Sequence, residues 1–368
     1  MPFGFGASTS TFGSTTTNNN SAQPQPQTQQ FPPGYNPIQV PGAPDDSVSS
    51  LNFCPVMQNN NTLAYFCASS WASDVRLWEL NTQNGQCQPK AQQTCKAPAL
   101  DTAWSTDGTK IYVACADKGG YCWDIASNQM QQIAAHDEPI STINVLSMNG
   151  TDVIMTGSFD KKVRFWQLGN TNPIAELILP FKIFAADACF PIAVCIGSDK
   201  GQAVITFESG KPEIKQKNYC NEDWPSKLNH QFSCVTVFKN KTTRQPEGFA
   251  VGATEGRSSL TYLNPQERKK VDPKNNNQPT WDPNFAFKCH RYTPAKVQVQ
   301  VQNASGNLET KSNNNLECDA FTVNFIKFHP EYQTLVTAGS DGMFTFWDKD
   351  HRTKLGPTER GGKVRILR

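Results

Sequence analysis

Short runs of apolar residues recur along most of the chain, and each is broken by a turn rich in glycine, aspartate and serine. The run from Val153 to Ser158 is typical: five residues or so, rich in β-branched side chains, ending in a polar turn. Runs of this length predict β-strands rather than helices. No apolar run reaches the 18 residues that a membrane span requires, so the pattern predicts many strands and no membrane insertion.

Tryptophan recurs in one context, at the end of an apolar run that follows a turn. Four runs end this way, with gaps of 45, 43 and 181 residues, at Trp78, Trp123, Trp166 and Trp347. Three of these tryptophans have an aspartate six residues earlier: Asp117, Asp160 and Asp341. A period of about 40–45 residues with a WD-like dipeptide is the signature of four-stranded propeller blades. The sequence therefore predicts an all-β fold, a WD40 β-propeller.

Six blade equivalents are readable, over residues 47–90, 97–133, 137–178, 182–215, 228–264 and 320–348. The fourth and fifth are degenerate, because Phe207 and Tyr262 stand where tryptophan is expected, and the first has Ala72 at the aspartate position. WD propellers usually close as rings of seven, since an open ring leaves unpaired edges. We therefore expect a missing C-terminal blade and interpret the chain as a truncated seven-bladed protein, whose segment Ile38-Gln39-Val40 would be a short closing strand.

Three other segments differ in composition from the predicted propeller at residues 45–350. Residues 1–44 are rich in Ser, Thr, Asn, Gln and Pro and contain three Phe-Gly dipeptides, which predicts a disordered tail. Residues 265–319 form an Asn/Gln-rich insertion, which we interpret as flexible loop around an ordered core at 285–291. Residues 351–368 are predicted to be an irregular basic tail.

One blade contains four polar side chains at positions that suit a hydrogen-bond network: His136, Thr156, Asp160 and Trp166. The aspartate of the turn can accept bonds from turn amides and from the histidine, while the indole donates to the hydroxyl. A catalytic triad is the functional alternative. Because the Asp–Trp spacing recurs, we interpret the set as a buried structural network. The same structural role is predicted for Asp117, Trp123, Asp341 and Trp78.

Composition argues against the commonest kinds of active site. The net charge is +2 and charged residues make up 18%, so any nucleic-acid binding must come from a local patch. The twelve cysteines are scattered without a CxxC pair, which predicts buried thiols in a reducing compartment. Histidines lack metal-ligand spacing, and phosphate-binding and nucleophile motifs are missing. We therefore expect no enzyme activity, no cofactor and no metal.

Several strings are similar to one particular family. They include Ser69 to Trp78, Phe287-Lys288-Cys289-His290-Arg291, and above all Phe346 to Leu355. Generic WD repeats do not share these strings. Over about residues 45–356 the chain resembles the WD-repeat mRNA export factor family called Rae or Gle. Two features depart from that family: the Asn-rich insertions at 271–279 and 298–316 are longer, and the seventh blade is missing.

The resemblance implies a seven-bladed scaffold of the nucleus, nuclear pore or envelope, and cytoplasm. Such a protein binds a GLEBS segment of an FG nucleoporin, acts in mRNA export, contacts mRNA or other single-stranded nucleic acid, and has roles at the mitotic spindle. A spindle-checkpoint propeller of the Bub family, which also binds GLEBS segments, is the alternative.

A rim of basic and aromatic residues is the candidate site for nucleic acid or a partner: Arg257, Phe287, Lys288, Arg291, Trp347, Asp348, Lys349, Arg352 and Lys354. Cations interleaved with aromatics suit phosphate contacts and base stacking. The alternative is that the cations are ordinary solvated loop residues and that Trp347 is a core residue. The functional role of Trp347 is implied by the resemblance alone.

Overall fold

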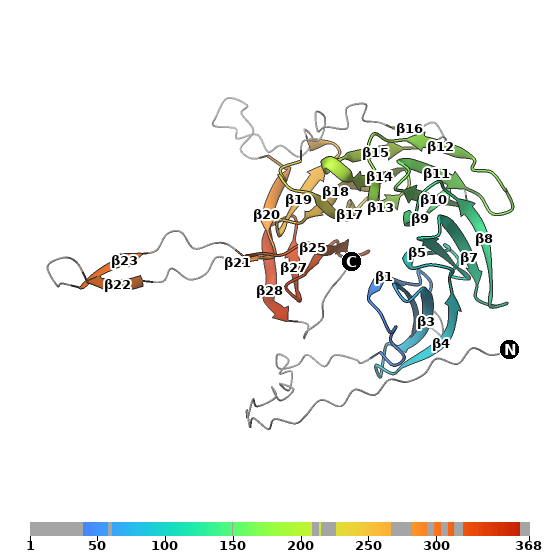
Figure 1. The fold of residues 1–368 in the computed structure, drawn as a ribbon, viewed down its shortest axis with the longest axis horizontal. Coiled ribbons are helices and arrows are strands. Elements are labelled where there is room, and N and C mark those ends of the chain that lie inside the picture. The colour runs from blue at the N-terminus through green and yellow to red at the C-terminus, as the bar shows by residue number, and fades with distance from the viewer. Residues whose placement is uncertain are drawn as a thin grey trace, which may run out of the picture.

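The computed structural model describes residues 40–57, 61–148, 150–207, 213–214, 226–265, 282–292, 298–302, 308–312 and 319–360. These residues form an all-β fold with six antiparallel four-stranded sheets arranged around a common centre (Figure 1). We call the sheets blades one to six in chain order. Beside the strands lies a 3₁₀ turn at Ser198–Lys200, labelled η1. Among the described residues, no helix is long and apolar enough to cross a membrane.

The first three blades follow the predicted repeat. Blade one contains β1 (Val48–Phe53), β2 (Leu63–Ser70), β3 (Asp74–Asn81) and β4 (Cys87–Thr94). Blade two contains β5 (Ala99–Trp104), β6 (Lys110–Cys115), β7 (Gly119–Asp124) and β8 (Gln129–Ala135). Blade three contains β9 (Ile140–Met148), β10 (Thr151–Ser158), β11 (Lys162–Trp166) and β12 (Ala175–Ile178).

The last three blades include the degenerate repeats. Blade four contains β13 (Ile183–Cys189), β14 (Ile192–Gly197), β15 (Gln202–Thr206) and β16 (Glu213–Ile214). Blade five contains β17 (Phe232–Lys239), β18 (Pro246–Ala253), β19 (Arg257–Tyr262) and β20 (Phe285–Lys288). Blade six contains β25 (Val323–Phe328), β26 (Leu335–Gly339), β27 (Met343–Asp348) and β28 (Thr353–Arg360).

The core lies between neighbouring blades. The first strands of successive blades contact one another in the order β1, β5, β9, β13, β17 and β25, and buried clusters fill each junction between blades. Tyr112 and Trp166 meet in this way between blades two and three, and the rings of Phe238 and Phe328 lie 5.1 Å apart between blades five and six. Because a middle blade packs on both faces, its second strand is buried over most of its length. The predicted propeller with six readable blades is confirmed.

Two carboxylates fasten neighbouring blades at their inner strands. Asp101 of β5 accepts bonds from the Thr142 hydroxyl of β9, at 3.0 Å, and from the next backbone N–H. Asp187 of β13 repeats this arrangement with Thr236 of β17, also at 3.0 Å. Each carboxylate satisfies two donors at a junction between blades, which favours one relative position of the two sheets.

The turn between the second and third strands of a blade needs a left-handed residue. Gly256 and Gly342 have φ of +70° and +72°, and Ser73, Lys118 and Lys161 hold the equivalent position with φ of 64° to 74°. Gly256 has a second constraint, since a Cβ there would lie 2.3 Å from the carbonyl oxygen of His290. The left-handed residue marks the blade turn even where tryptophan or aspartate is missing.

Two segments outside the predicted blades turn out to be strands. The core of the insertion supplies β20, which pairs with β19 and completes blade five, so blade five does not end at residue 264. The segment predicted to be an irregular tail supplies β28, which pairs with β27; the tail prediction is therefore wrong for residues 353–360. Two smaller pairs lie in the insertion: β21 (Arg291–Tyr292) with β24 (Asp319–Ala320), and β22 (Gln298–Gln302) with β23 (Leu308–Ser312).

Residues 40–43, assigned to the predicted tail, lie against blade one. The Trp78 indole donates to the carbonyl oxygen of Pro41 at 2.8 Å, and Val40 packs beside the same ring. The predicted closing strand at 38–40 and the Phe-Gly dipeptides fall almost wholly outside the described residues.

Each end blade has an exposed apolar sheet face. In blade one, Leu51 and Phe53 are 48% and 56% exposed. In blade six, Phe325 and Phe346 are 43% and 44% exposed. Among the described residues, these faces contact no further blade.

The cysteines that the structure describes are free thiols, most of them in or beside the core. Burial raises the pKa of Cys67 and Cys195 to about 12, so both remain protonated and behave as small apolar side chains.

Candidate functional site

Blade three brings its four predicted polar side chains into one chain of hydrogen bonds. The Trp166 indole donates to the Thr156 hydroxyl at 2.9 Å, which lies 2.8 Å from His136 Nε2, and His136 Nδ1 lies 2.9 Å from Asp160. A neutral histidine that donates from Nδ1 to Asp160 and accepts at Nε2 from Thr156 gives each of the four side chains a hydrogen-bond partner. Burial lowers the pKa of His136 despite the neighbouring carboxylate, in keeping with this neutral form. The His136, Thr156 and Trp166 side chains are buried and that of Asp160 is 5% exposed, as the predicted structural role requires.

Blade six contains the same network, built partly from the insertion. The Trp347 indole donates to Thr337 at 3.0 Å, and His290 contacts Thr337 at 3.2 Å and Asp341 at 3.0 Å. The histidine precedes the aspartate by 24 residues in blade three but by 51 in blade six. The insertion hides the repeat, so sequence reasoning missed His290 and Thr337.

Blades one and two depart from the predicted hydrogen bonds. In blade two the Trp123 indole donates to Asn128 at 3.0 Å rather than to a second-strand hydroxyl, and Asp117 accepts from the Gly119 amide and the Tyr121 hydroxyl. In blade one the Trp78 indole donates to a backbone carbonyl outside the sheet. The prediction of a Trp-to-hydroxyl bond is therefore wrong for these two blades.

A pocket of about 260 Å³ lies between blades five and six. Its lining combines apolar and charged side chains: Leu260, Phe285, Ala286, Phe287, Leu335, Trp347, Asp348, Lys349 and Arg352. Five of these belong to the predicted rim. The structure therefore brings Phe287, Trp347, Asp348, Lys349 and Arg352 together.

Aromatic rings form the apolar part of this pocket. The ring centres of Phe287 and Trp347 lie 4.7 Å apart with an angle of 58° between the planes. The Arg352 guanidinium lies over Phe285, 4.2 Å from the ring centre, and also donates to the carbonyl oxygen of Asp282. A cation held against an aromatic face within about 6 Å is attracted by the ring quadrupole. The pocket thus presents aromatic surface with a guanidinium held against it.

Lys349 is buried, contrary to its interpretation as a solvated rim cation. The residue is 3% exposed. Its ammonium lies 2.7 Å from Asp350 and 3.9 Å from Glu247, and it faces the rings of Phe238 and Tyr262 at 5.2 Å and 5.9 Å. These contacts come from blade five and the adjoining loop. Lys349 is therefore a structural cation that supports the pocket from behind.

The loop after β27 is held by its own carboxylates. Asp348 accepts from the Asp350 amide at 2.8 Å and from His351 Nδ1 at the same distance. Burial alone would raise the pKa of Asp350, but hydrogen bonds from Lys349 and Lys241 hold it at about 2. The Asp348 and Asp350 carboxylates thus hold the loop that carries Arg352.

The other predicted rim cations lie beyond the pocket. Arg257 and Lys288 are register partners at the end of blade five, and Arg291 forms an ion pair with Glu255 at 3.6 Å. Lys354 lies exposed on β28 beside the pocket tryptophan. The nine predicted residues therefore form a pocket group and an outer group of cations, not one continuous patch.

Four pocket residues were not predicted: Leu260, Phe285, Ala286 and Leu335. The alternation of Phe285 and Phe287 along β20 places both on one face of the sheet, and this is the signal that could have found the first of them. Among the residues that the structure describes, no group of three or more His, Cys, Asp or Glu side chains could hold a metal ion.

Comparison with known proteins decides the family. A family model described as WD domain, G-beta repeat, matches residues 127–167 and 311–348. The mRNA export factor rae-1 of Caenorhabditis elegans is 38% identical over 87% of this chain and 75% of its own length. Protein Rae1 of Drosophila melanogaster is 38% identical over 88% of this chain and 81% of its own length. The mRNA export factor of Xenopus tropicalis is 39% identical over 88% of this chain and 77% of its own length. This chain belongs to the Rae1 family. The resemblance to the Rae or Gle family is thereby confirmed. The two matches to the WD repeat contain Trp166 and Trp347, so the Rae1-family chain has its repeat signature in the two blades that contain the full network.

Proposed function

We propose that this protein is a non-enzymatic adaptor in mRNA export, which contacts RNA at the pocket between blades five and six and docks on a GLEBS segment of a nucleoporin. The relatives named mRNA export factor support the process. A propeller whose polar networks are built into its blades supports a binding rather than a catalytic role. The names of these relatives also support a role in both the nucleus and the cytoplasm. We propose the nuclear pore as the place of docking.

The pairing of Arg352 with Phe285 is the observation that carries the RNA proposal. Proteins bind single-stranded RNA by stacking bases on aromatic rings or guanidinium planes and by pairing phosphates with cations. The Phe287 and Trp347 rings offer the apolar wall for a base, while Arg352 and the exposed Lys354 offer charge at its mouth. Asp348 and Lys349 contribute by fixing the loop.

Fluorescence anisotropy with a labelled oligouridylate about ten nucleotides long tests this proposal. The double variant Arg352→Glu, Lys354→Glu is expected to weaken binding and to reduce the salt slope by about 0.7 for each phosphate that the variant no longer neutralises. Lys96→Glu, which changes an exposed lysine far from the pocket, is the matched control and should leave the slope unchanged. A slope that is identical in both variants would remove the pocket from the RNA site.

Nucleoporin docking is tested separately by titration with a synthetic GLEBS peptide. We expect binding to the intact chain, and we expect Arg352→Glu to weaken RNA binding more than peptide binding. Failure to bind the peptide under conditions in which RNA binds would leave the RNA interface standing and would overturn the nucleoporin part of the proposal.

A further inference from the structure

The outer edge of blade two differs from the outer edges of the other blades. Among the residues that the structure describes, the strand order β5-β6-β7-β8 gives one side of β8 no partner strand. β8 has the sequence Gln-Met-Gln-Gln-Ile-Ala-Ala, without a charge or a proline. Proteins usually protect exposed strand edges with charges, prolines or short length, because a free edge is a template for another strand.

The other five outer strands all have such protection. β4 contains Pro89 and Lys90, and β28 contains one proline, Pro357, and several charged residues. β12, β16 and β20 are two to four residues long, and each contains a charged residue: Glu176, Glu213 and Lys288. β8 is covered only at its end, where the Arg164 guanidinium donates to the Ala135 carbonyl oxygen at 2.7 Å. Among the described outer strands, its stretch from Gln129 to Ala134 is the exception without such protection.

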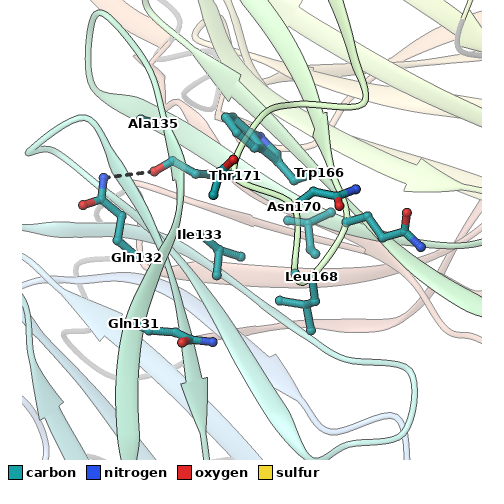
Figure 2. Close-up of a pocket in the computed structure, with 12 residues that line it drawn as sticks. Gln131, Gln132, Ile133, Ala135, Trp166, Leu168, Asn170 and Thr171 are labelled. Atoms are coloured by element: carbon teal, nitrogen blue, oxygen red, sulfur yellow. Dashed lines mark hydrogen bonds between the residues drawn. The ribbon is translucent and has the colours of Figure 1, made fainter.

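A groove of about 410 Å³ lies beside β8, within the ~300–1,000 Å³ range of ligand pockets. One wall is β8 itself; the other is Trp166 and the loop that follows β11 (Figure 2). Ile133 lies on the first wall, and Leu168 and Asn170 lie on the second. The lining contains amide, hydroxyl and apolar side chains but no charged residue. Such a surface suits an uncharged chain that carries its own hydrogen-bonding groups, and it offers nothing to pair with phosphate or carboxylate.

One side chain of β8 forms a hydrogen bond within its own strand. The Gln132 amide donates to the backbone carbonyl oxygen of Ala134, at 3.2 Å (Figure 2). From Gln129 to Gln132 the pairing with β7 is regular, and the one bulge comes after it, at Ile133. This regular stretch is where a fifth strand would add.

We propose that β8 is a docking edge for an extended peptide segment of another polypeptide, which adds to blade two as a fifth strand. Its backbone would bond to β8, and alternate side chains would enter the groove against Ile133, Trp166 and Leu168. Strand addition takes affinity from main-chain bonds and selectivity from pockets for alternate side chains. The groove chemistry selects a segment that alternates apolar with uncharged polar residues. This site is separate from the pocket between blades five and six.

The full-length chain is titrated with a labelled short peptide of alternating valine and threonine, blocked at both ends. A peptide with alternate backbone nitrogens methylated is the ligand control, because it cannot donate to a strand edge. The variants are Gln131→Lys, which places a charge on the β8 edge, and Leu168→Asp, which places one in the groove. Thr94→Lys, at an exposed position on the outer strand of blade one, is the matched control. Circular dichroism verifies that each variant is folded.

We expect saturable binding that weakens about tenfold or more in Gln131→Lys and Leu168→Asp and is unchanged in Thr94→Lys. Hydrogen exchange should slow within β8 when the peptide is bound. Equal binding by all variants, or equal binding of the methylated peptide, would overturn the proposal. Dimerisation of the free chain that Gln131→Lys abolishes would also overturn it, because the occupant of the edge would then be a second copy.

Discussion

Replacing Asp160 with alanine removes the acceptor at the centre of the blade-three network. Its carboxylate accepts from His136 Nδ1 at 2.9 Å, from the Lys162 amide at 2.9 Å and from the Asp137 amide at 3.1 Å. The side chain of His136 is 0% exposed and that of Asp160 is 5% exposed, so water cannot easily replace the missing acceptor. The variant leaves three donors without their partner.

The size of the effect follows from those donors. An unsatisfied buried donor costs about 1–3 kcal/mol. The histidine is deeply buried, while the two amides lie in a surface turn that water reaches more easily, so we expect a total loss of about 2–4 kcal/mol. A loss of 1 kcal/mol lowers the Tm of a domain of this size by roughly 2–4 °C, so Asp160→Ala should melt about 5–15 °C lower.

Thermal unfolding followed by tryptophan fluorescence measures this change. Asp137→Ala is the matched control: it removes a carboxylate in the same turn, but one whose side chain is 70% exposed and paired only with surface cations. Exposed ion pairs contribute little to the free energy of unfolding, so the Tm of Asp137→Ala should be almost that of the original chain. RNA binding well below the melting temperature should be equal in both variants. An unchanged Tm in Asp160→Ala, or RNA binding lost without loss of stability, would refute the structural role of the network.

Three further outcomes are expected. Lys349→Glu should lower the Tm, because it places a second negative group beside Asp350, whereas Lys354→Glu on exposed β28 should not; equal melting would contradict the buried position of Lys349. Because the pKa of His136 is lowered in the folded state, the unfolded chain takes up a proton first as the pH falls below about 6.5, and the free energy of unfolding should decrease between about pH 7.5 and 5.5. The Tm of His136→Gln should depend less steeply on pH over this range. An equal slope would argue against His136 as the origin of the pH dependence. Phe346→Ser should reduce concentration-dependent light scattering, because it removes exposed apolar surface from blade six; unchanged scattering would mean that this face does not drive association.

The repeat could be predicted from the sequence because each blade is largely a local structure. Strands, turns and the Asp–Trp spacing all lie within about 40 residues, so the alternation of apolar runs and tight turns indicates them directly. Blade five shows where this reasoning fails. Its outer strand β20 pairs with β19 although residues 263–284 separate the two strands in the sequence. A four-residue run so far from its sheet carries no local sign of its partner.

The candidate site was less predictable, because it depends on contacts between blades. The sequence shows Lys349 as one cation in a polar loop, whereas its burial comes from Phe238 and Tyr262, more than eighty residues earlier. The grouping of Phe287 with Trp347 also requires two blades to be in place. Composition could indicate that basic and aromatic residues gather near the end of the chain, but not which cations are solvated.

The pairing of β21 with β24 has a consequence for how the length of the insertion can change. Tyr292 and Asp319 are register partners, and the Phe321 amide donates to the carbonyl oxygen of His290, so the two ends of the segment 292–319 are held side by side next to blade six. The free energy of closing a loop grows only with the logarithm of its length, by about 0.6 kcal/mol for each doubling. Mutations that lengthen or shorten the sequence between Tyr292 and Asp319 are therefore nearly neutral for the blade. This position is a permissive site, where the gene can gain or lose codons and where an epitope tag or a fluorescent domain can be inserted without breaking the histidine network.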